Sequence, residues 1–185
     1  VVWSSVSFTL PNNVENLFLF SNEAAIIGTG NNLDNYISGN SLDNILSGLA
    51  GNDRLVGDNG NDSLNGGGGQ DLFLFEESGL PDYDTINDFS HVDDTVGLRD
   101  LLDGVFDSSL QGLTFTDSVL NADCYFEGPG FTGNGPGPAG IYNDTNTGKI
   151  YYNPTSFLSW DSVIICTVGV ATAPSLDNTD FVYST

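Results

Sequence analysis

Apolar side chains recur every nine residues through the middle of the chain, in phase with glycine. Five consecutive frames each begin with glycine and carry an apolar residue at the eighth position: Ile37, Leu46, Leu55, Leu64 and Phe73. The first six residues of a frame are rich in Gly, Asn and Asp, which favour turns and tolerate positive φ. The last three predict a short strand whose middle side chain points to one side. Each frame is therefore expected to form one turn and one short strand.

Two variants of this frame follow each other. The frames Gly48–Val56, Gly57–Asn65 and Gly66–Leu74 fit G-x-x-G-x-D-x-U-x, where U is apolar. The earlier frames Gly30–Ser38 and Gly39–Ser47 share the variant G-N-[NS]-L-D-N-x-U-S. A flexible Gly/Asn linker is the alternative interpretation, but a linker predicts no fixed phase between glycine and apolar positions. The phase favours a stacked repeat.

The order turn, strand, turn, strand closes one coil in two frames, and successive coils stack with the apolar position inside. We therefore predict an all-β fold: a parallel β-roll, which is a solenoid of nonapeptides, capped by an antiparallel β-rich C-terminal region. The expected parts are flanking strands over residues 1–29, the roll over residues 30–75 and the cap over residues 76–185. The core of such a roll is only one or two side chains thick, so it needs a further source of stability.

The charge balance points to that source. The chain has 25 acidic residues against three basic ones, and a net charge of −22 makes the compact state repel itself. Aspartate, whose short carboxylate suits tight turns and hard cations, outnumbers glutamate 20 to 5. Nucleic acid and anionic membrane surfaces are poor partners for such a chain. We find no apolar run of transmembrane length, no N-terminal signal segment and no methionine, so we expect part of a longer or processed protein.

The turns offer the oxygen ligands that calcium prefers. Gly-rich turns expose backbone carbonyls, and the acid at the sixth position adds a charged ligand. Magnesium demands tighter octahedral geometry, and zinc favours His or Cys, which are scarce here. The sequence therefore predicts several Ca²⁺ ions. The candidate ligands in the repeats are Gly48, Ala50, Gly51, Asp53, Gly57, Asn59, Gly60, Asp62, Gly66, Gly67, Gly68, Gly69 and Asp71.

The calcium sites are expected to differ along the roll. Because alternate turns lie on the same side, a site needs one turn and the second turn after it. The turns ending at Asp53 and Asp71 form the one pair with Gly at position 4 and Asp at position 6 on both sides, so they predict a full site. The turn ending at Asp62 has mixed neighbours. The turns ending at Asn35 and Asn44 are expected to hold no calcium and to use their side-chain amides to satisfy the turn backbone.

With these repeats the chain resembles the C-terminal part of RTX proteins, which bacterial type I secretion systems export and which include serralysin-type proteases and large surface proteins. The flank SSVSFTLPNNVENLFL and the segment DTINDFSHVDD are similar to the segments on either side of the family's repeats. The resemblance implies that Asp84 and Asp88, with Asp94 as a further candidate, cap the roll and bind another calcium ion. Ile86 and Phe89 are expected to seal the stack. An ordinary solvated acidic turn is the alternative.

The C-terminal third of the sequence predicts further strands. Ile141–Asn153 alternates around Asn-Thr-Gly and predicts a β-hairpin, and Ser162–Val170 predicts another buried strand. The hairpin resembles one in the RTX family, although Asn153-Pro154 replaces the usual acidic continuation. The ending DNTDFVYST resembles the acid-then-apolar C-terminus of type I export substrates, with a terminal strand that carries no signal as the alternative.

The residues offer no catalytic constellation. His91 is the single histidine, and the chain has neither H-E-x-x-H nor G-x-S-x-G. Cys124 and Cys166 either form one disulfide or stay as buried thiols. We therefore expect a protein without catalytic activity of its own.

The favoured function is a calcium-folded module that serves type I secretion and extracellular folding, with calcium and the type I secretion machinery as partners. One alternative is a structural subunit or terminal domain of a surface layer, adhesin or extracellular fibre, which assembles with itself or with a cell-surface partner. Another is the non-catalytic tail of a secreted hydrolase. All three place the protein outside the cell or at its surface.

Overall fold

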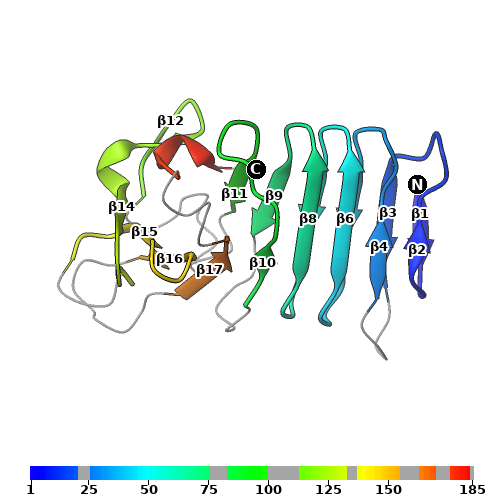
Figure 1. The fold of residues 1–185 in the computed structure, drawn as a ribbon, viewed down its shortest axis with the longest axis horizontal. Helices are drawn as coiled ribbons and strands as arrows, with labels where there is room; N and C mark the ends of the chain where they lie inside the picture. The colour runs from blue at the N-terminus through cyan, green and yellow to red at the C-terminus, as the bar shows by residue number, and fades with distance from the viewer. Residues whose placement is uncertain are drawn as a thin grey trace.

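Two nine-stranded β-sheets, called sheet A and sheet B, make up the described part of the chain (Figure 1). This computed structural model describes residues 1–20, 26–75, 83–99, 113–132, 137–154, 163–169 and 176–183. The strands of the repeat region lie side by side, one after another along the long axis of the molecule, with the N-terminus at one end. The fold is all-β, as predicted.

Each sheet brings together strands from the flank, the repeats and the C-terminal region. In order across the sheet, sheet A contains β1 (Val2–Ser4), β3 (Asn16–Leu19), β5 (Tyr36–Ser38), β7 (Arg54–Val56), β9 (Leu72–Phe75), β11 (Thr95–Leu98), β18 (Phe181–Tyr183), β13 (Val119–Leu120) and β12 (Phe115–Thr116). Sheet B contains, likewise in order, β14 (Tyr125–Gly128), β15 (Gly140–Asp144), β16 (Lys149–Asn153), β17 (Val163–Thr167), β10 (Thr85–Ile86), β8 (Ser63–Gly68), β6 (Ile45–Ala50), β4 (Ile27–Thr29) and β2 (Phe8–Thr9). The described part of the C-terminal region also contains the short 3₁₀ helices η2 (Ala122–Cys124) and η4 (Asn178–Asp180).

The repeat strands pair in parallel with a partner two frames away. In sheet A, Ile37 lies opposite Leu55, and Leu55 lies opposite Phe73. In sheet B, Leu46 lies opposite Leu64. A coil therefore consists of two frames, and consecutive frames fall in opposite sheets. The predicted parallel β-roll is confirmed.

The eighth position of every frame forms the core between the two sheets. Ile37, Leu46, Leu55, Leu64 and Phe73 all have an exposed fraction of 0%. Within each frame the eighth residue is the one that belongs to the core cluster, so each coil of two frames contributes two such residues to a narrow core. Stacking of the coils is what completes the burial of each residue.

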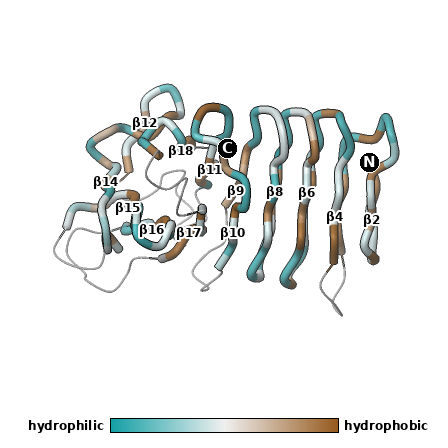
Figure 2. The backbone as a smooth tube through the Cα atoms, viewed as in Figure 1, coloured by the Kyte–Doolittle hydropathy of each residue, from teal (hydrophilic) through white to brown (hydrophobic). Residues whose placement is uncertain are grey.

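The roll extends beyond residues 30–75 at both ends. The flank over residues 1–29 supplies β1 to β4, and these pair in parallel with each other and with the first repeat strands. Figure 2 shows β4 as hydrophobic in its first part and close to neutral beyond it. Ile86 and Phe89 are buried core residues, as expected, but Ile86 belongs to β10, and β17 and β18 continue the two sheets beyond β10 and β11. These two residues therefore join the core without ending the stack.

The C-terminal region is a continuation of both sheets. The predicted hairpin is present: β15 and β16 pair antiparallel, with Ile141 opposite Tyr152. The predicted strand is also present as β17, which pairs antiparallel with β16 and parallel with β10. Cys124 and Cys166 are thiols buried in the core, which fits the second of the two expectations for them. No helix in the described ranges has the length and apolar character needed to cross a membrane.

Neighbouring residues of β6 provide a test of this core. Leu46 is fully buried, whereas Ile45 is 49% exposed. Leu46→Ala is expected to lower the free energy of unfolding by about 2–5 kcal/mol, because the narrow core cannot close the cavity. Ile45→Ala is expected to cost less than about 1 kcal/mol. Urea unfolding in saturating calcium measures both, and equal losses would contradict the inward placement of the eighth position.

Candidate metal sites

The side chains at the sixth position of the frames line up in two columns, one on each side of the roll. Each carboxylate accepts a hydrogen bond from the backbone N–H of the preceding member of its column. In the first column Asp53 Oδ1 accepts from Asn35 N–H at 2.7 Å, Asp71 Oδ1 from Asp53 N–H at 2.8 Å and Asp94 Oδ1 from Asp71 N–H at 3.0 Å. In the second, Asp62 Oδ1 accepts from Asn44 N–H at 2.7 Å and Asp84 Oδ1 from Asp62 N–H at 2.8 Å. The structure thus brings together the alternate turns that the sequence paired.

In the two asparagine turns, the side chain at the sixth position bonds to the backbone of its own turn. Asn35 Oδ1 accepts a hydrogen bond from Asn31 N–H at 2.6 Å, and Asn44 Oδ1 accepts one from Asn40 N–H at 2.7 Å. The expected bonds from side-chain amide to turn backbone are therefore present. Because these oxygens already have a donor, the two turns have the least need for a cation.

The aspartate turns leave one carboxylate oxygen without a donor. Asp53 Oδ2 and Asp71 Oδ2 are buried, and no hydrogen-bond donor reaches them within the described residues. A Cβ atom built on Gly48 would overlap Asp53 Oδ2 and would lie 2.7 Å from the carbonyl oxygen of Gly66. The glycine that opens each frame is thus required by the side chain five places later, which is an acid in the three aspartate frames. A buried anionic oxygen beside a backbone carbonyl, with no N–H to satisfy it, fits a hard cation such as Ca²⁺.

The backbone of the aspartate turns also differs from that of the asparagine turns. Positions 2 and 4 have positive φ in the aspartate turns: Leu49 (82°), Gly51 (111°), Asp58 (63°), Gly60 (130°), Gly67 (101°) and Gly69 (140°). Position 4 of the asparagine turns is Leu33 or Leu42, and neither has positive φ. A Cβ atom on Gly51 would also lie 2.6 Å from the backbone of Leu33 in the preceding coil. Glycine at position 4 is therefore needed for both its conformation and its close packing.

Burial and like charges make the acids of the first column hard to ionise. Burial raises the pKa of Asp53 to about 7; the Asn35 N–H opposes this rise, and the charges of Asp71 and Asp34 add to it. Burial also raises the pKa of Asp71, with a smaller contribution from Asp88. A raised pKa means that the folded roll holds the proton more tightly than the unfolded chain does, so the ionised carboxylate costs stability at neutral pH. A bound cation would offset this cost.

The acids after the last repeat accept hydrogen bonds from the backbone of the last repeat turns. Asp84 continues the second column through its bond to Asp62 N–H. Asp88 is exposed, and its two oxygens accept hydrogen bonds from Gly66 N–H at 3.0 Å and Gly67 N–H at 2.9 Å. Asp94 Oδ2 accepts from Ser90 N–H at 2.8 Å, and burial raises the pKa of Asp94 to about 6. All three acids cap the backbone of the final turns, and their role as calcium ligands stays a prediction.

The remaining candidates occupy different places in the turns. Gly57, Asn59, Gly60 and Asp62 lie in the turn on the second side of the roll. Ala50 and Gly68 pair with each other where β6 and β8 run on into their turns, so these strands are longer than the predicted three residues.

A second hydrogen-bond ladder runs through position 5 of the frames. Asp34 Oδ1 accepts from Asn52 N–H at 2.7 Å, and Asp43 Oδ1 accepts from Asn61 N–H at 2.8 Å. The sequence interpretation missed this ladder, although Asp or Asn at the fifth position of four frames was the signal. The ladder joins the turns of neighbouring coils. Its acceptors include Asp34 and Asp43, which are the acids of the two asparagine turns.

Comparison with known families agrees with this geometry. Residues 38–73 match the model of the RTX calcium-binding nonapeptide repeat, in four copies. A search of curated proteins found no match. The fold and the turns define a parallel β-roll with calcium-binding turns. This part of the chain is an RTX repeat region, and Ca²⁺ is the ion that its repeats bind.

Two glycines of the candidate set test the turn geometry. Gly51 has positive φ and contacts the preceding coil, whereas Gly68 has open space around its Cα. Gly51→Ala is expected to cost about 1–3 kcal/mol of folding free energy and to raise the calcium concentration needed for folding severalfold. Gly68→Ala is expected to leave that concentration within about twofold, since it keeps the carbonyl. Calcium titration followed by circular dichroism compares them, and equal shifts would contradict the turn conformations.

The raised pKa of Asp53 predicts that protons compete with calcium near neutral pH. Between pH 7.5 and pH 6.0 a carboxyl with a pKa of about 7 becomes mostly protonated, so calcium affinity at this turn is expected to fall about five- to tenfold. Acids with ordinary pKa values stay ionised over this range. Isothermal titration calorimetry at the two pH values measures the change. An unchanged affinity would show that Asp53 does not contribute a buried carboxylate to the site.

Proposed function

We propose that this chain is a calcium-folded RTX module that is exported unfolded and folds outside the cell. The observation that carries the proposal is the pair of buried oxygens, Asp53 Oδ2 and Asp71 Oδ2, which no hydrogen-bond donor reaches within the described residues. They lie in consecutive turns of one column, joined by the hydrogen bond from Asp53 N–H to Asp71 Oδ1. Such turns are complete only with a cation.

The proposed mechanism is a change of calcium concentration between compartments. In a low-calcium cytosol the buried acids repel each other, and the narrow core does not compensate, so the chain stays unfolded. Extracellular calcium modules bind at about 10⁻⁴–10⁻³ M, which lies between the two compartments. Each site adds RT ln(1 + [Ca²⁺]/Kd), roughly 1–2 kcal/mol at ten times Kd, and coupled sites in one column make the transition steep.

The residues that would hold calcium belong to the turns themselves. Among the described residues, His91, Asp177 and Asp180 are the one group of three His, Cys, Asp or Glu side chains whose ligand atoms lie within 4.8 Å of each other. The repeat turns therefore rely on single carboxylates combined with backbone carbonyls, of which the Gly66 carbonyl beside Asp53 is an example. Calcium supplies positive charge there, and the chain orders its backbone around it.

We also propose that the module has no catalytic role. Its acids are spaced by the repeat and bonded to backbone N–H groups of the neighbouring coil, which is a structural use of carboxylates. His91 lies outside the repeat frames and is engaged by Asp180. The same features suit a secreted protein whose other activities, if any, lie in further domains.

Exchange of one acid for its amide tests the proposal. Asp71→Asn keeps an oxygen that can accept from Asp53 N–H and copies the residue found at Asn35, but it removes the charge. It is expected to raise the calcium midpoint of folding about tenfold, because each column site depends on its formal charge. Asn35→Ala is expected to shift the midpoint less. Circular dichroism during a calcium titration measures both.

The matched control is Asp93→Asn, which removes one acid outside the columns. It changes the net charge by the same amount and is expected to leave the midpoint unchanged or slightly lower. If the chain were folded without calcium, or if Asp93→Asn and Asp71→Asn shifted the midpoint equally, general charge rather than turn ligation would govern folding and the proposal would fail.

A further inference from the structure

Residues 181–183 form an inner strand rather than a free tail. Strand β18 lies between β11, with which it pairs in parallel, and β13, with which it pairs antiparallel. Phe181 has an exposed fraction of 0%, and its ring packs 5.7 Å from the ring of Tyr125. Tyr183 N–H donates to the carbonyl of Ser118 at 2.8 Å. A segment that resembles an export terminus is thus enclosed in the folded protein.

The loop Ser90–Asp94, called the capping loop, is built on the last repeat turn. Its Asp94 accepts the N–H of Asp71 at 3.0 Å and the N–H of Ser90 at 2.8 Å. The N–H groups of Asp93 and Asp94 both donate to the carbonyl of Ser90. The loop therefore takes this shape when the turn ending at Asp71 is in place.

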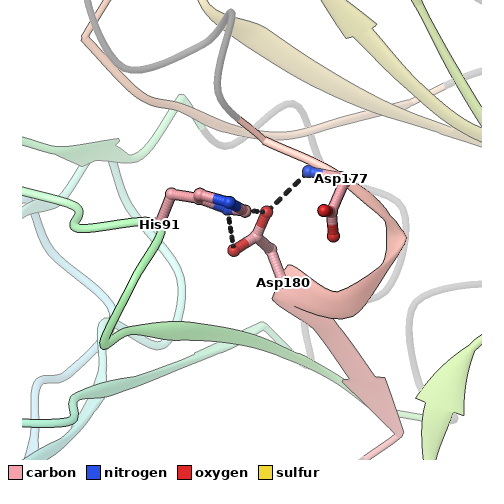
Figure 3. A group of neighbouring side chains, drawn as sticks. All are labelled: His91, Asp177 and Asp180. Atoms are coloured by element: carbon pink, nitrogen blue, oxygen red, sulfur yellow. Dashed lines mark hydrogen bonds and ion pairs between the residues drawn. The ribbon is translucent and has the colours of Figure 1, made fainter.

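His91 projects from the capping loop toward the residues that precede β18 (Figure 3). Its Nδ1 lies 3.0 Å from both Oδ1 and Oδ2 of Asp180. Asp180 is only 2% exposed, and its Oδ2 also accepts from Asp177 N–H at 2.7 Å. Asp177 Oδ1 in turn accepts from Thr179 N–H, which completes a capping box around η4.

The His91–Asp180 pair is a direct polar link between the capping loop and this segment. The other charged group close to Asp180 is Asp177, which has the same sign. Burial raises the pKa of Asp180, and His91 opposes that rise. Removal of His91 would leave a buried carboxylate beside another acid, an arrangement that costs more than an exposed one.

We infer that His91 is a latch that holds residues 177–183 in sheet A only when the repeat turn ending at Asp71 is ordered. The inference rests on the proposed function in one respect, namely that calcium orders this turn. It adds that calcium loading encloses the C-terminal strand. A partner that recognises residues 177–183 would then bind the calcium-free chain and release the folded one.

Hydrogen exchange measured by mass spectrometry tests the latch on the full chain. In the wild-type protein the amides of residues 181–183 are expected to become protected at the same calcium midpoint as the roll, which circular dichroism follows separately. His91→Ala is expected to keep the midpoint of the roll within about twofold. At saturating calcium it is expected to raise exchange at residues 181–183 about tenfold or more, as for a lost hydrogen bond to a charged group.

The matched control is Asp93→Asn, a change in the same loop at a side chain that bonds to Ser90 Oγ. It is expected to leave exchange at residues 181–183 unchanged. Asp180→Asn keeps an acceptor for Asp177 N–H and removes the charge, and combining it with His91→Ala is expected to add little to either single change. His91→Phe, which keeps a planar ring and has no donor for Asp180, serves the same purpose if the alanine variant does not fold.

Two results would overturn the latch while the proposed function stands. One is protection of residues 181–183 without calcium, while the roll still needs calcium to fold. The other is equal exchange in the His91→Ala and Asp93→Asn variants. A roll that folds without calcium would instead remove the proposed function, and the latch with it.

Discussion

The structure depends on where the carboxylate at the sixth position of each aspartate frame places its two oxygens. Oδ1 accepts a hydrogen bond from a backbone N–H of the preceding coil, as Asp71 Oδ1 does from Asp53 N–H at 2.8 Å, and this bond joins neighbouring coils. Oδ2 is then turned inward against the glycine that opens the frame, where no N–H reaches it in the turns of Asp53 and Asp71. The same carboxylate therefore joins two coils through one oxygen and presents a buried negative charge through the other. Stacking of the coils and binding of a cation thus depend on one side chain.

This arrangement explains why so acidic a chain can be compact. The acids of the columns are buried next to each other, and the pKa of Asp53 rises to about 7 as a consequence. Each frame contributes one apolar residue to the core cluster between the sheets, so this core gives limited compensation. The asparagine turns at the start of the roll replace the charge by an amide that bonds its own turn. We expect them to form an end of the roll that needs no cation, on which the charged coils can stack.

Both ends of the repeat are continued by sequence that lacks the repeat. On one side β1 to β4 form coils from ordinary alternating strands, and on the other β10, β11, β17 and β18 extend the two sheets. Asp84 and Asp94 continue the two columns after the frames have stopped, each at the position where a sixth-position acid would lie. The capping loop contains both Asp94 and His91. The contact between His91 and Asp180 therefore connects the C-terminal segment to the loop that ends the first column.

The order of amino acids alone was enough to predict the roll, because a nine-residue period is a local property of the sequence. Glycine, the polar sixth residue and the apolar residue must each return in phase if one coil is to stack on the next. The same period predicted the buried positions Ile37 to Phe73 and the pairing of Asp53 with Asp71, and local alternation predicted the hairpin at residues 141–153. Other features became visible only in the folded chain: Asp88 and Asp94 bond to backbone N–H groups, Leu49 takes a φ of 82°, and β18 lies inside sheet A. These features depend on contacts between separate coils or between distant segments that do not repeat, so no periodic signal records them.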